Sequence, residues 1–310
     1  MDIPTLQKKL DEAKYICNGD VAATLLVALQ LGRPLLIEGP AGVGKTEIAK
    51  VMASALDREL VRLQCYEGLD ESKALYEWNY QKQLLSIQVQ MDRRDADELT
   101  KSLFSDDYLL ERPLLRAIRS EKPVVLLIDE IDKSDEEFEA FLLELLSEMQ
   151  VTIPETGVVK AKSIPFVVLT SNRTRPLGEA LRRRCAYLYL QYPDIDKEVA
   201  IIRAKRPNVN EHLAVQVAQA IHDLRQSETI LKKPSIAETL DWVSALEALG
   251  ISDLTKEAAR QTMGFVLKSS EDLEAAGDVL YGQNCGCGHD HEHGHGEAHE
   301  HCGACGHHQA

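Results

Sequence analysis

The eight residues from Gly39 to Thr46, GPAGVGKT, constrain the fold of this chain more than any other stretch. The spacing of the glycines and of Lys45 fits the pattern G-x-x-x-x-G-K-[ST]. Glycines let the backbone curl so that successive N–H groups point into one anion-sized hollow, at the positive end of the next helix. An apolar run at 35–38 precedes the loop, and residues 47–56 have helical apolar spacing without a breaker. The sequence therefore predicts a strand, a phosphate-binding loop and a helix, in that order.

Two residues at the end of this loop have specific expected roles. Lys45 is expected to reach the β and γ phosphates of a nucleoside triphosphate, and the Thr46 hydroxyl to coordinate Mg²⁺. An ordinary glycine-rich turn is the alternative, and the flanking strand and helix disfavour it. The predicted nucleotide-binding residues of the loop are Gly39, Pro40, Ala41, Gly42, Val43, Gly44, Lys45 and Thr46.

Length and composition indicate a globular protein of two domains. The chain has 310 residues, of which 44% are hydrophobic and 27% charged, which is enough for a real core. No apolar run approaches the roughly 20 residues that span a bilayer. The N-terminal segment 1–15 is polar and acidic, which disfavours a signal peptide, so a cytoplasmic location is expected. The formal charge of −15 argues against nonspecific attraction to nucleic acid, although it leaves room for a local basic loop.

The apolar pattern predicts an α/β fold, a P-loop parallel sheet with helices on both faces, followed by a small all-α lid domain and a disordered tail. Short β-rich runs separated by helical stretches are typical of a buried parallel sheet. These runs are 61–65, 123–129, 165–170 and 187–192. The expected domains are 1–193 for the nucleotide-binding part, 194–275 for the lid and 276–310 for the tail. In the lid, Ser235 is a predicted N-cap with Glu238 three residues on, and Gly250 a predicted C-cap.

The run VVLLIDE at 124–130 supplies a carboxylate pair at a strand end. Asp129 is expected to hold the water shell of Mg²⁺, and Glu130 to orient and deprotonate the attacking water. The alternative is that the two acids only end a strand and cap the next helix. Four apolar residues directly before Asp-Glu, downstream of a phosphate-binding loop, favour the catalytic interpretation.

Two further elements complete a hydrolytic site. Asn172 ends the strand that begins at Pro165, so it is a candidate to position the lytic water, although an asparagine there is also a common turn former. The run EALRRRC at 179–185 offers arginines that would stabilise charge on the transferring phosphoryl group of a neighbouring subunit. Arg183 and Arg184 are the favoured candidates, and a basic surface turn is the competing interpretation.

The order GPAGVGKT, VVLLIDE, LTSNR and ALRRRC, with a helical region behind it, resembles an AAA+ ATPase. Within that family the chain most resembles the MoxR branch and its CoxD-like maturation ATPases, which are associated with carbon monoxide dehydrogenase and related molybdenum hydroxylases. The resemblance covers roughly residues 15–270. It implies ATP and Mg²⁺ as ligands, a homo-oligomeric ring with six subunits as the expected number, and a chaperone acting on a client metalloenzyme. It also implies a partner protein with a von Willebrand factor A domain.

Two segments fit this resemblance and one departs from it. Residues 150–166 read as a β-hairpin, and 66–88 as an insertion whose aromatics Tyr76, Trp78 and Tyr80 either grip a client or pack on the domain. Many AAA+ lids carry an arginine that reaches the γ-phosphate, but the corresponding stretch KKPSIAETLDW has none. Lys232 or Lys233 is the expected substitute.

The last residues form a Cys/His-rich segment that has no apolar core to join. Eight of the ten histidines and four of the seven cysteines lie in residues 285–308. Thiolate and imidazole ligands suit Zn²⁺, Ni²⁺ and copper ions, so a flexible transition-metal site is expected, with a solubilising low-complexity tail as the alternative. The predicted ligands are Cys285, Cys287, Cys302, Cys305, His289, His291, His293, His295, His299 and His301.

These features favour an ATP-driven chaperone for metalloenzyme maturation. The alternative is a metallochaperone or metal-storage protein whose nucleotide gates metal release. A motor that acts on nucleic acid would have the same AAA+ fold, but the net charge of −15 disfavours this function. A GTPase is disfavoured because the chain has no Asn-Lys-x-Asp motif.

Overall fold

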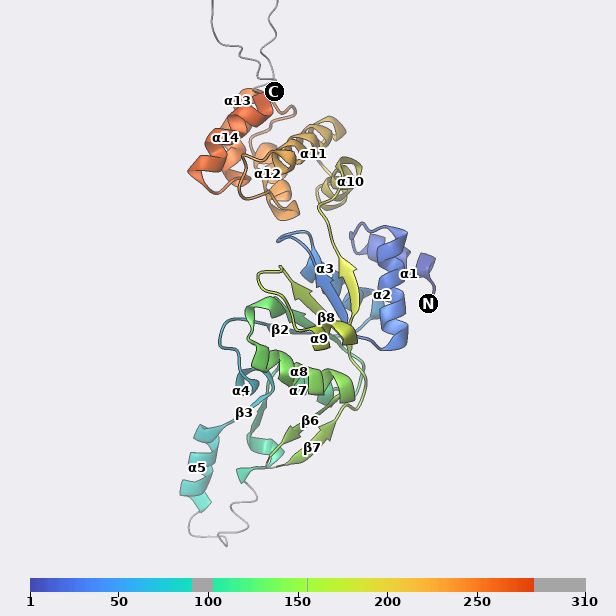
Figure 1. The fold of residues 1–310 in the computed structure, drawn as a ribbon, viewed down its shortest axis with the longest axis vertical. Helices are drawn as coiled ribbons and strands as arrows, with labels where there is room; N and C mark the ends of the chain where they lie inside the picture. Colours follow the sequence, from blue (N-terminus) through green and yellow to red (C-terminus); the bar gives the residue numbers. More distant parts are fainter. Residues whose placement is uncertain (91–102, 155, 282–310) are drawn as a thin grey trace, which may run out of the picture.

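The computed structural model describes residues 1–90, 103–154 and 156–281 of the chain. These residues form a parallel sheet with helices on both faces and, above it in Figure 1, a separate group of helices. The predicted α/β fold with a following helical domain is confirmed. Within the described ranges, no helix combines the length and apolarity that crossing a bilayer requires.

The central sheet has five strands, all parallel, in the order β2-β5-β8-β1-β9. They are β1 (Leu35–Glu38), β2 (Leu60–Gln64), β5 (Val125–Asp129), β8 (Phe166–Ser171) and β9 (Ala186–Tyr189). Carboxyl ends of parallel strands meet at one edge of a sheet. The register accordingly pairs Gln64 with Asp129, and Glu38 with both Ser171 and Tyr189. The strand predicted over 187–192 ends at Tyr189, and the chain then passes to the helical domain.

Alternate side chains of the strands pack on opposite faces of the sheet, as its pleat requires. Leu35 and Ile37 of β1 belong to a core with the helices α1 (Ile3–Glu12), α2 (Gly19–Leu31) and α3 (Lys45–Leu56). Leu36 points the other way, into a core with α7 (Pro113–Arg119), α8 (Glu136–Glu148) and α9 (Glu179–Arg184). Both faces are therefore covered, so the edge at the strand ends is the part of the sheet left for a ligand.

The helical domain has its own core around Trp242, which is fully buried and donates its indole N–H to Thr262 at 2.7 Å. Its helices are α10 (Ile195–Lys205), α11 (Glu211–Gln226), α12 (Ile236–Ala248), α13 (Lys256–Thr262) and α14 (Ser270–Tyr281). The predicted caps are present, since Ser235 and Glu238 form a capping box and Gly250 adopts φ +67° after α12. The boundary expected after residue 275 falls inside α14, where Ala276 is buried.

A buried ion pair joins three helices of this domain. Arg225 of α11 donates to both carboxylate oxygens of Glu198 on α10, and Thr239 of α12 donates to the same carboxylate at 2.7 Å. The Arg225 guanidinium also lies 4.7 Å from the centre of the Tyr192 ring, in the connection between the domains. The ion pair therefore links the core of the lid to the segment that connects the lid to the sheet domain.

Two excursions extend from the far end of the sheet domain, at the bottom of Figure 1. The predicted hairpin is confirmed as β6 (Gln150–Ile153) paired with β7 (Gly157–Lys160). The insertion contains α4 (Glu71–Ala74), β3 (Tyr76–Trp78) and α5 (Tyr80–Gln90), and β3 pairs with β4 (Leu109–Glu111) after the short helix η1 (Asp106–Tyr108).

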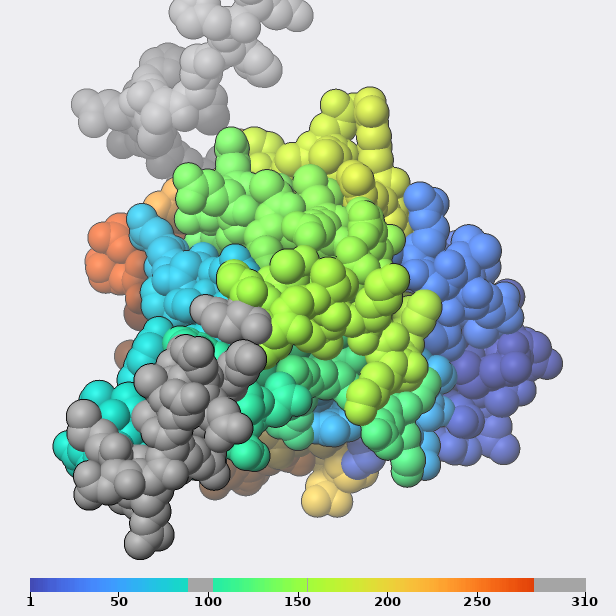
Figure 2. Space-filling view, turned by 90° about the horizontal axis from the view of Figure 1, so that it is seen from below, coloured from blue at the N-terminus to red at the C-terminus, as the bar shows by residue number. Residues whose placement is uncertain are grey.

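The aromatics of the insertion divide between the core and the surface. Trp78 is buried at 6% exposure and packs in the core under α7 and α8, whereas Tyr80 is 62% exposed. Figure 2, seen from this end, shows the insertion in cyan at the left and the N-terminal helices in blue at the right. For Trp78, the alternative of a strand packed on the domain is therefore the correct one.

Candidate nucleotide-binding site

The loop between β1 and α3 is shaped by three glycines with positive φ. These angles are +154° at Gly39, +72° at Gly42 and +93° at Gly44. Side chains are excluded here, since a Cβ atom on Gly39 would lie 2.2 Å from the carbonyl oxygen of Leu190, and one on Gly42 would lie 2.3 Å from the Cβ of Ser235. The loop is thus a backbone cradle, pressed on one side by the connection to the lid and on another by the start of α12.

Lys45, the first residue of α3, places its ammonium group over this cradle. The group donates hydrogen bonds to the carbonyl oxygens of Gly39 at 2.8 Å and Pro40 at 2.6 Å, and the residue is 6% exposed. Burial lowers the pKa of Lys45, and the carboxylates of Asp132 and Asp129 oppose this shift. A buried cation held only by carbonyl oxygens at a helix N-terminus is suited to phosphate oxygens, which offer full charge. The predicted residues of the loop therefore come together in one site.

Thr46 and Asp129 are the two predicted magnesium ligands, and the structure brings them into contact. The Thr46 hydroxyl donates to Asp129 Oδ1 at 2.9 Å. Thr170 of β8 donates to the same oxygen at 2.5 Å, and Arg62 of β2 donates to Oδ2 at 2.6 Å. Asp129 is 2% exposed. A hydroxyl and a carboxylate side by side are the hard oxygen donors that Mg²⁺ prefers, so the residues fit this ion.

Glu130 follows Asp129 in a left-handed conformation, with φ +57°. Its carboxylate binds Lys133 at 2.6 Å and accepts a hydrogen bond from Gln64 at 3.0 Å. The side-chain amide of Asn172 lies 3.4 Å from the other carboxylate oxygen. Glu130 and Asn172 were predicted to act on the same water molecule, and the structure places their side chains next to each other.

Asp132 fixes the backbone that carries Asn172. Its carboxylate accepts hydrogen bonds from the backbone N–H of Asn172 at 3.2 Å, and from the N–H and hydroxyl of Thr174 at 2.9 and 2.6 Å. Burial raises the pKa of Asp132, but the hydrogen bonds from Thr174 and Asn172 outweigh it and leave the pKa below its usual value. Asp132 is therefore an ionised brace that holds Asn172 against Glu130.

The two candidate arginines lie on α9, away from the loop of their own chain. Arg183 is 75% exposed in its side chain and pairs with Glu179 at 2.5 Å. Arg184 donates to the hydroxyl of Ser147 at 2.7 Å and to the carbonyl oxygen of Ala180 at 3.1 Å. The structure does not bring either residue to the site formed by Lys45, so any catalytic contact would have to come from a second copy.

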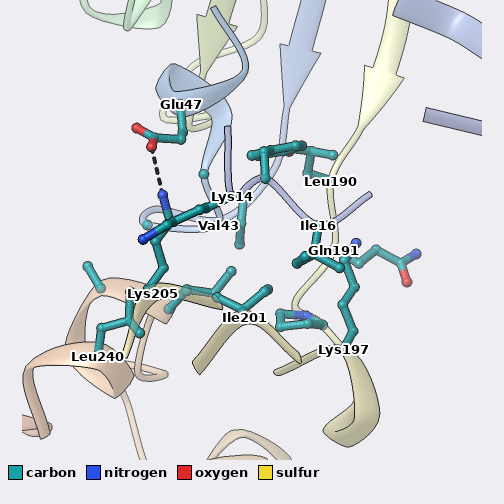
Figure 3. A pocket seen from close by; sticks show the side chains of 16 residues that line it. Lys14, Ile16, Val43, Glu47, Leu190, Gln191, Lys197, Ile201, Lys205 and Leu240 are labelled. Carbon is teal, nitrogen blue, oxygen red and sulfur yellow. Dashed lines mark hydrogen bonds and ion pairs between the residues drawn. The ribbon is translucent and has the colours of Figure 1, made fainter. Parts of the chain in front are cut away.

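A cavity of about 340 Å³ opens beside the loop, between the sheet domain and the lid. Figure 3 shows its walls, with Val43 of the loop and Leu190 of the connection facing Ile201 and Leu240 of the lid. Apolar walls next to a phosphate cradle suit the base of a nucleotide. At one side Lys205 of α10 binds Glu47 of α3 at 3.2 Å, which ties the lid to the helix that follows the loop.

Lys233, one of the two lysines expected to replace the lid arginine, makes a side-chain contact within the lid. The Lys233 ammonium donates to the carbonyl oxygen of Ser227, and the backbone N–H of Lys232 donates to Asp272 at 3.3 Å. Both contacts lie within the lid. Ser235 occupies the position nearest the loop, and the lid cation that meets α3 is Lys205.

Residues that contact the predicted carboxylates and Asn172 but were not themselves predicted from the sequence include Arg62, Gln64, Asp132 and Thr170. Two of them had a detectable signal. In VRLQC the apolar residues alternate with Arg62 and Gln64, which places both polar side chains on one face at the end of a buried strand. The strand order puts β2 beside β5, and that order is not readable from one sequence.

Residues 34–185 match the family model of the AAA domain of the dynein-related subfamily. This part of the chain is an AAA domain. The matched residues contain the loop, the carboxylate pair and strands β1, β2, β5 and β8, whereas β9 and the helical domain follow them in the chain.

Relatives of the whole chain are distant. They include uncharacterized proteins of Staphylococcus saprophyticus, 24% identical over 233 residues, and Staphylococcus epidermidis, 26% identical over 232 residues, each alignment covering 73% of this chain and 79% of the relative. A solved structure similar to the AAA domain and lid is the RuvB Holliday junction branch migration motor of Thermotoga maritima. Its TM-score is 0.47 at 19% identity, over 84% of this chain and 72% of that chain.

The predicted transition-metal ligands of the tail lie outside the described residues. This applies to all of the cysteines and histidines predicted between Cys285 and Cys305. In the part of the chain that the structure describes, no cluster of three or more His, Cys, Asp or Glu side chains has the geometry of a metal site.

Proposed function

We propose that the protein is an ATPase that hydrolyses ATP to ADP and phosphate and uses the reaction to move its lid against its AAA domain. The contact between Thr46 and Asp129, at 2.9 Å, is the observation that carries this proposal. It joins the phosphate-binding loop to the carboxylate pair of a strand that is not adjacent to β1 in the sheet. An accidental glycine-rich turn would have no reason to meet an acidic strand end.

The residues of the loop would hold the phosphates. Backbone N–H groups from Gly42 to Thr46 would bind the phosphate oxygens, and Lys45, which now binds the carbonyl oxygens of Gly39 and Pro40, would move to the β and γ phosphates. Mg²⁺, when bound by Thr46 and by Asp129 through its water shell, would neutralise charge on the phosphates. The apolar cavity under Leu240 and Ile201 would take the base.

Glu130 is the proposed general base for the attacking water. Its carboxylate lies within 3.4 Å of the Asn172 amide, so the two side chains can share one water molecule, with Glu130 accepting its proton and Asn172 orienting its oxygen. Lys133 and Gln64 hold the carboxylate in place. Asp129 and Glu130 have different partners, since Asp129 binds Thr46 and Glu130 binds Lys133.

Arg183 or Arg184 is proposed to complete the site of a neighbouring copy in a ring. The Arg183 side chain is 75% exposed, and it is bound only to Glu179 four residues earlier on the same helix among its described ion pairs. An exposed i, i+4 pair contributes well under 1 kcal/mol, so this arginine is easily released to a phosphate. That role requires a homo-oligomer, and the resemblance to AAA+ ATPases implies a ring of six subunits.

The finer proposal is that the motor acts as a chaperone of the MoxR type on a client metalloenzyme. Support comes from the sequence resemblance to CoxD-like maturation ATPases and from the Cys/His-rich residues 285–308, which follow the helical domain in the sequence. A von Willebrand factor A domain protein is the proposed partner, and the cytoplasm the proposed location. Such a tail would deliver Zn²⁺, Ni²⁺ or a copper ion to the client, since ligands without a rigid scaffold release ions readily.

Two substitutions test the ATPase. Lys45→Ala is expected to abolish nucleotide binding, because the loop loses its charge. Glu130→Gln keeps the shape and the hydrogen bonds but cannot accept a proton, so we expect unchanged ATP affinity and turnover reduced by about 100-fold or more. Phosphate release and binding of a fluorescent ATP analogue measure the two effects, and normal turnover of the Glu130→Gln protein removes Glu130 from the mechanism.

Mixing experiments test the arginines. Lys45→Ala subunits keep their arginines, and Arg183→Ala or Arg184→Ala subunits keep their loop. If one arginine acts on a neighbouring site, a mixture of the two inactive proteins regains part of the ATPase rate. Recovery with one arginine variant identifies the acting residue, whereas no recovery with either shows that α9 is only a basic surface.

A metallochaperone with nucleotide-gated release is the second candidate, favoured by the density of ligands in the tail. A chain that ends at Tyr281, where α14 ends, keeps every described helix and separates the two functions. An ATPase rate that is unchanged by this truncation and stimulated by client favours the motor. A rate that depends on bound metal in the full chain and is lost on truncation favours the metallochaperone.

A further inference from the structure

Arg62 forms a direct ion pair with the proposed magnesium-binding carboxylate. It lies on β2, and its guanidinium donates to Asp129 Oδ2 at 2.6 Å. The same group donates to the side-chain oxygen of Gln64 at 2.5 Å, and Gln64 in turn donates to Glu130. One cation therefore contacts the metal-binding carboxylate directly and the water-activating carboxylate through a single amide.

The two partners of this pair differ in their surroundings. The Asp129 side chain is only 3% exposed, and its Oδ1 already accepts from the hydroxyls of Thr46 and Thr170. The Arg62 side chain is 50% exposed. Asp129 is therefore fixed, whereas Arg62 reaches it from water at the edge of the sheet and can leave without disturbing the core. A cation in this place lowers the negative potential that attracts a second cation.

We propose that Arg62 competes with Mg²⁺ for the negative charge of Asp129 and so sets the Mg²⁺ concentration at which the protein binds nucleotide. This inference rests on the proposed ATPase function and names a regulatory residue of its site. When Mg²⁺ neutralises Asp129, the contact with Arg62 weakens. The guanidinium is then free to move away from Gln64, which changes the contacts of Glu130. Binding of Mg²⁺ at Asp129 would thus alter the hydrogen bonds of Glu130 through Arg62 and Gln64.

A merely structural Arg62 would behave differently. If its task were to hold β2 against β5, its removal would destabilise the protein and lower turnover without changing the Mg²⁺ dependence of binding. The strands are already joined by a continuous parallel register from Leu60 to Gln64, so the side chain is not needed for pairing. The Mg²⁺ dependence of nucleotide binding therefore distinguishes an Arg62 that competes with Mg²⁺ from an Arg62 that only stabilises the fold.

The experiment compares Arg62→Met, which keeps an unbranched stem without charge, with Arg62→Lys, which keeps the charge. Arg116→Met is the matched control, because Arg116 lies in the same domain, pairs with Glu59 before β2 and has no contact with Asp129. Binding of a fluorescent ADP analogue to the full chain is titrated with Mg²⁺. A parallel series in EDTA measures affinity without the metal, and thermal melting confirms that each variant is folded.

We expect the half-saturating Mg²⁺ concentration to fall by roughly three- to tenfold in Arg62→Met, as removal of one nearby charge requires. Arg62→Lys and Arg116→Met should stay close to the parent protein, and affinity in EDTA should be unchanged. An Arg62→Met protein that binds nucleotide with the parent's Mg²⁺ requirement, or a higher one, overturns the inference and leaves the ATPase proposal standing. Absence of nucleotide binding in every protein, the parent included, overturns both.

Discussion

Gln64 at the end of β2 donates a hydrogen bond of 3.0 Å to Glu130 at the end of β5. These residues are far apart in the sequence, and the pairing of Gln64 with Asp129 in the sheet register brings them together. Glu130 thereby has partners from three elements, since Asn172 follows β8 and Lys133 lies in the turn after β5. The proposed base is held by residues at the carboxyl ends of the strands. Substitutions at these strand ends are therefore expected to affect catalysis.

Thr170 tests this dependence. Its hydroxyl donates to Asp129 and accepts from the backbone N–H of Glu130 at 2.9 Å, and the residue is 1% exposed. Thr170→Val keeps the shape but leaves both groups without this partner, so we expect a loss of about 1–3 kcal/mol in the free energy of unfolding. Turnover should fall as well. Thr170→Ser, which keeps the hydroxyl, should recover both quantities in denaturant unfolding and phosphate-release assays, and equal behaviour of the two variants would contradict the prediction.

Gly42 tests the contact between loop and lid. Alanine there is strained by φ +72°, and its Cβ would lie 2.3 Å from the Cβ of Ser235. We expect Gly42→Ala to push α12 off the loop and to weaken ATP binding by about tenfold, a cost of about 1–2 kcal/mol for the strained backbone and the clash. Adding Ser235→Gly removes the clash but not the strain. Partial recovery of ATP affinity in the double variant would support a contact between the lid and the loop at Ser235. No recovery would show that the strained backbone at residue 42 accounts for the whole loss.

Glu47 and Lys205 predict a pH dependence. Burial raises the pKa of Glu47, but Lys205 and Lys50 outweigh it, so the pKa lies below its ordinary value of 4.5. A carboxyl group with a lowered folded-state pKa stabilises the fold above its unfolded pKa, and this stabilisation is lost as the pH falls through the folded pKa.

The difference in unfolding free energy between the parent and Glu47→Gln should thus be constant between about pH 6 and 8. It should shrink below 4.5, the ordinary pKa of the group. The same comparison in a Lys205→Met background should show a smaller difference at neutral pH. A difference that grows on acidification would contradict the ion pair as a stabilising contact.

Arg225 predicts a stability effect confined to the lid. Its side chain is 4% exposed and that of Glu198 is 1% exposed. Arg225→Met leaves Glu198 as an uncompensated buried charge, which typically costs about 3–5 kcal/mol. Changing Glu198→Leu as well should recover most of that loss. Trp242 reports on the lid by fluorescence once Trp78 is replaced by Phe, and an unchanged lid transition in Arg225→Met would refute the prediction.

The sequence predicted the elements of this fold well because their signals are local. Glycine spacing marked the cradle from Gly39 to Gly44, and apolar runs before Asp129 and Asn172 marked two buried strands. Contacts made across the sheet were not local. The partners of Asp129, namely Arg62 and Thr170, depend on strand order, which one sequence does not encode as a pattern.

The lid was the least predictable part for a related reason. Lys232 and Lys233 were expected at the nucleotide because of their place in the sequence, but the position of α12 leaves Ser235 nearest the loop. The end expected for this domain, after residue 275, lies within α14, which continues past Ala276 and Asp278 to Tyr281.

Leu190 lies at the junction of the two domains and touches the first glycine of the loop. Its N–H donates to the carbonyl oxygen of Glu38 at 2.8 Å, and its own carbonyl oxygen leaves no room for a side chain on Gly39. Two residues later, Tyr192 lies under Arg225 of the lid. The connection between the domains therefore contacts the phosphate-binding loop through Leu190 and the core of the lid through Tyr192. A shift of Gly39 would therefore reach the lid through the backbone of residues 190–192.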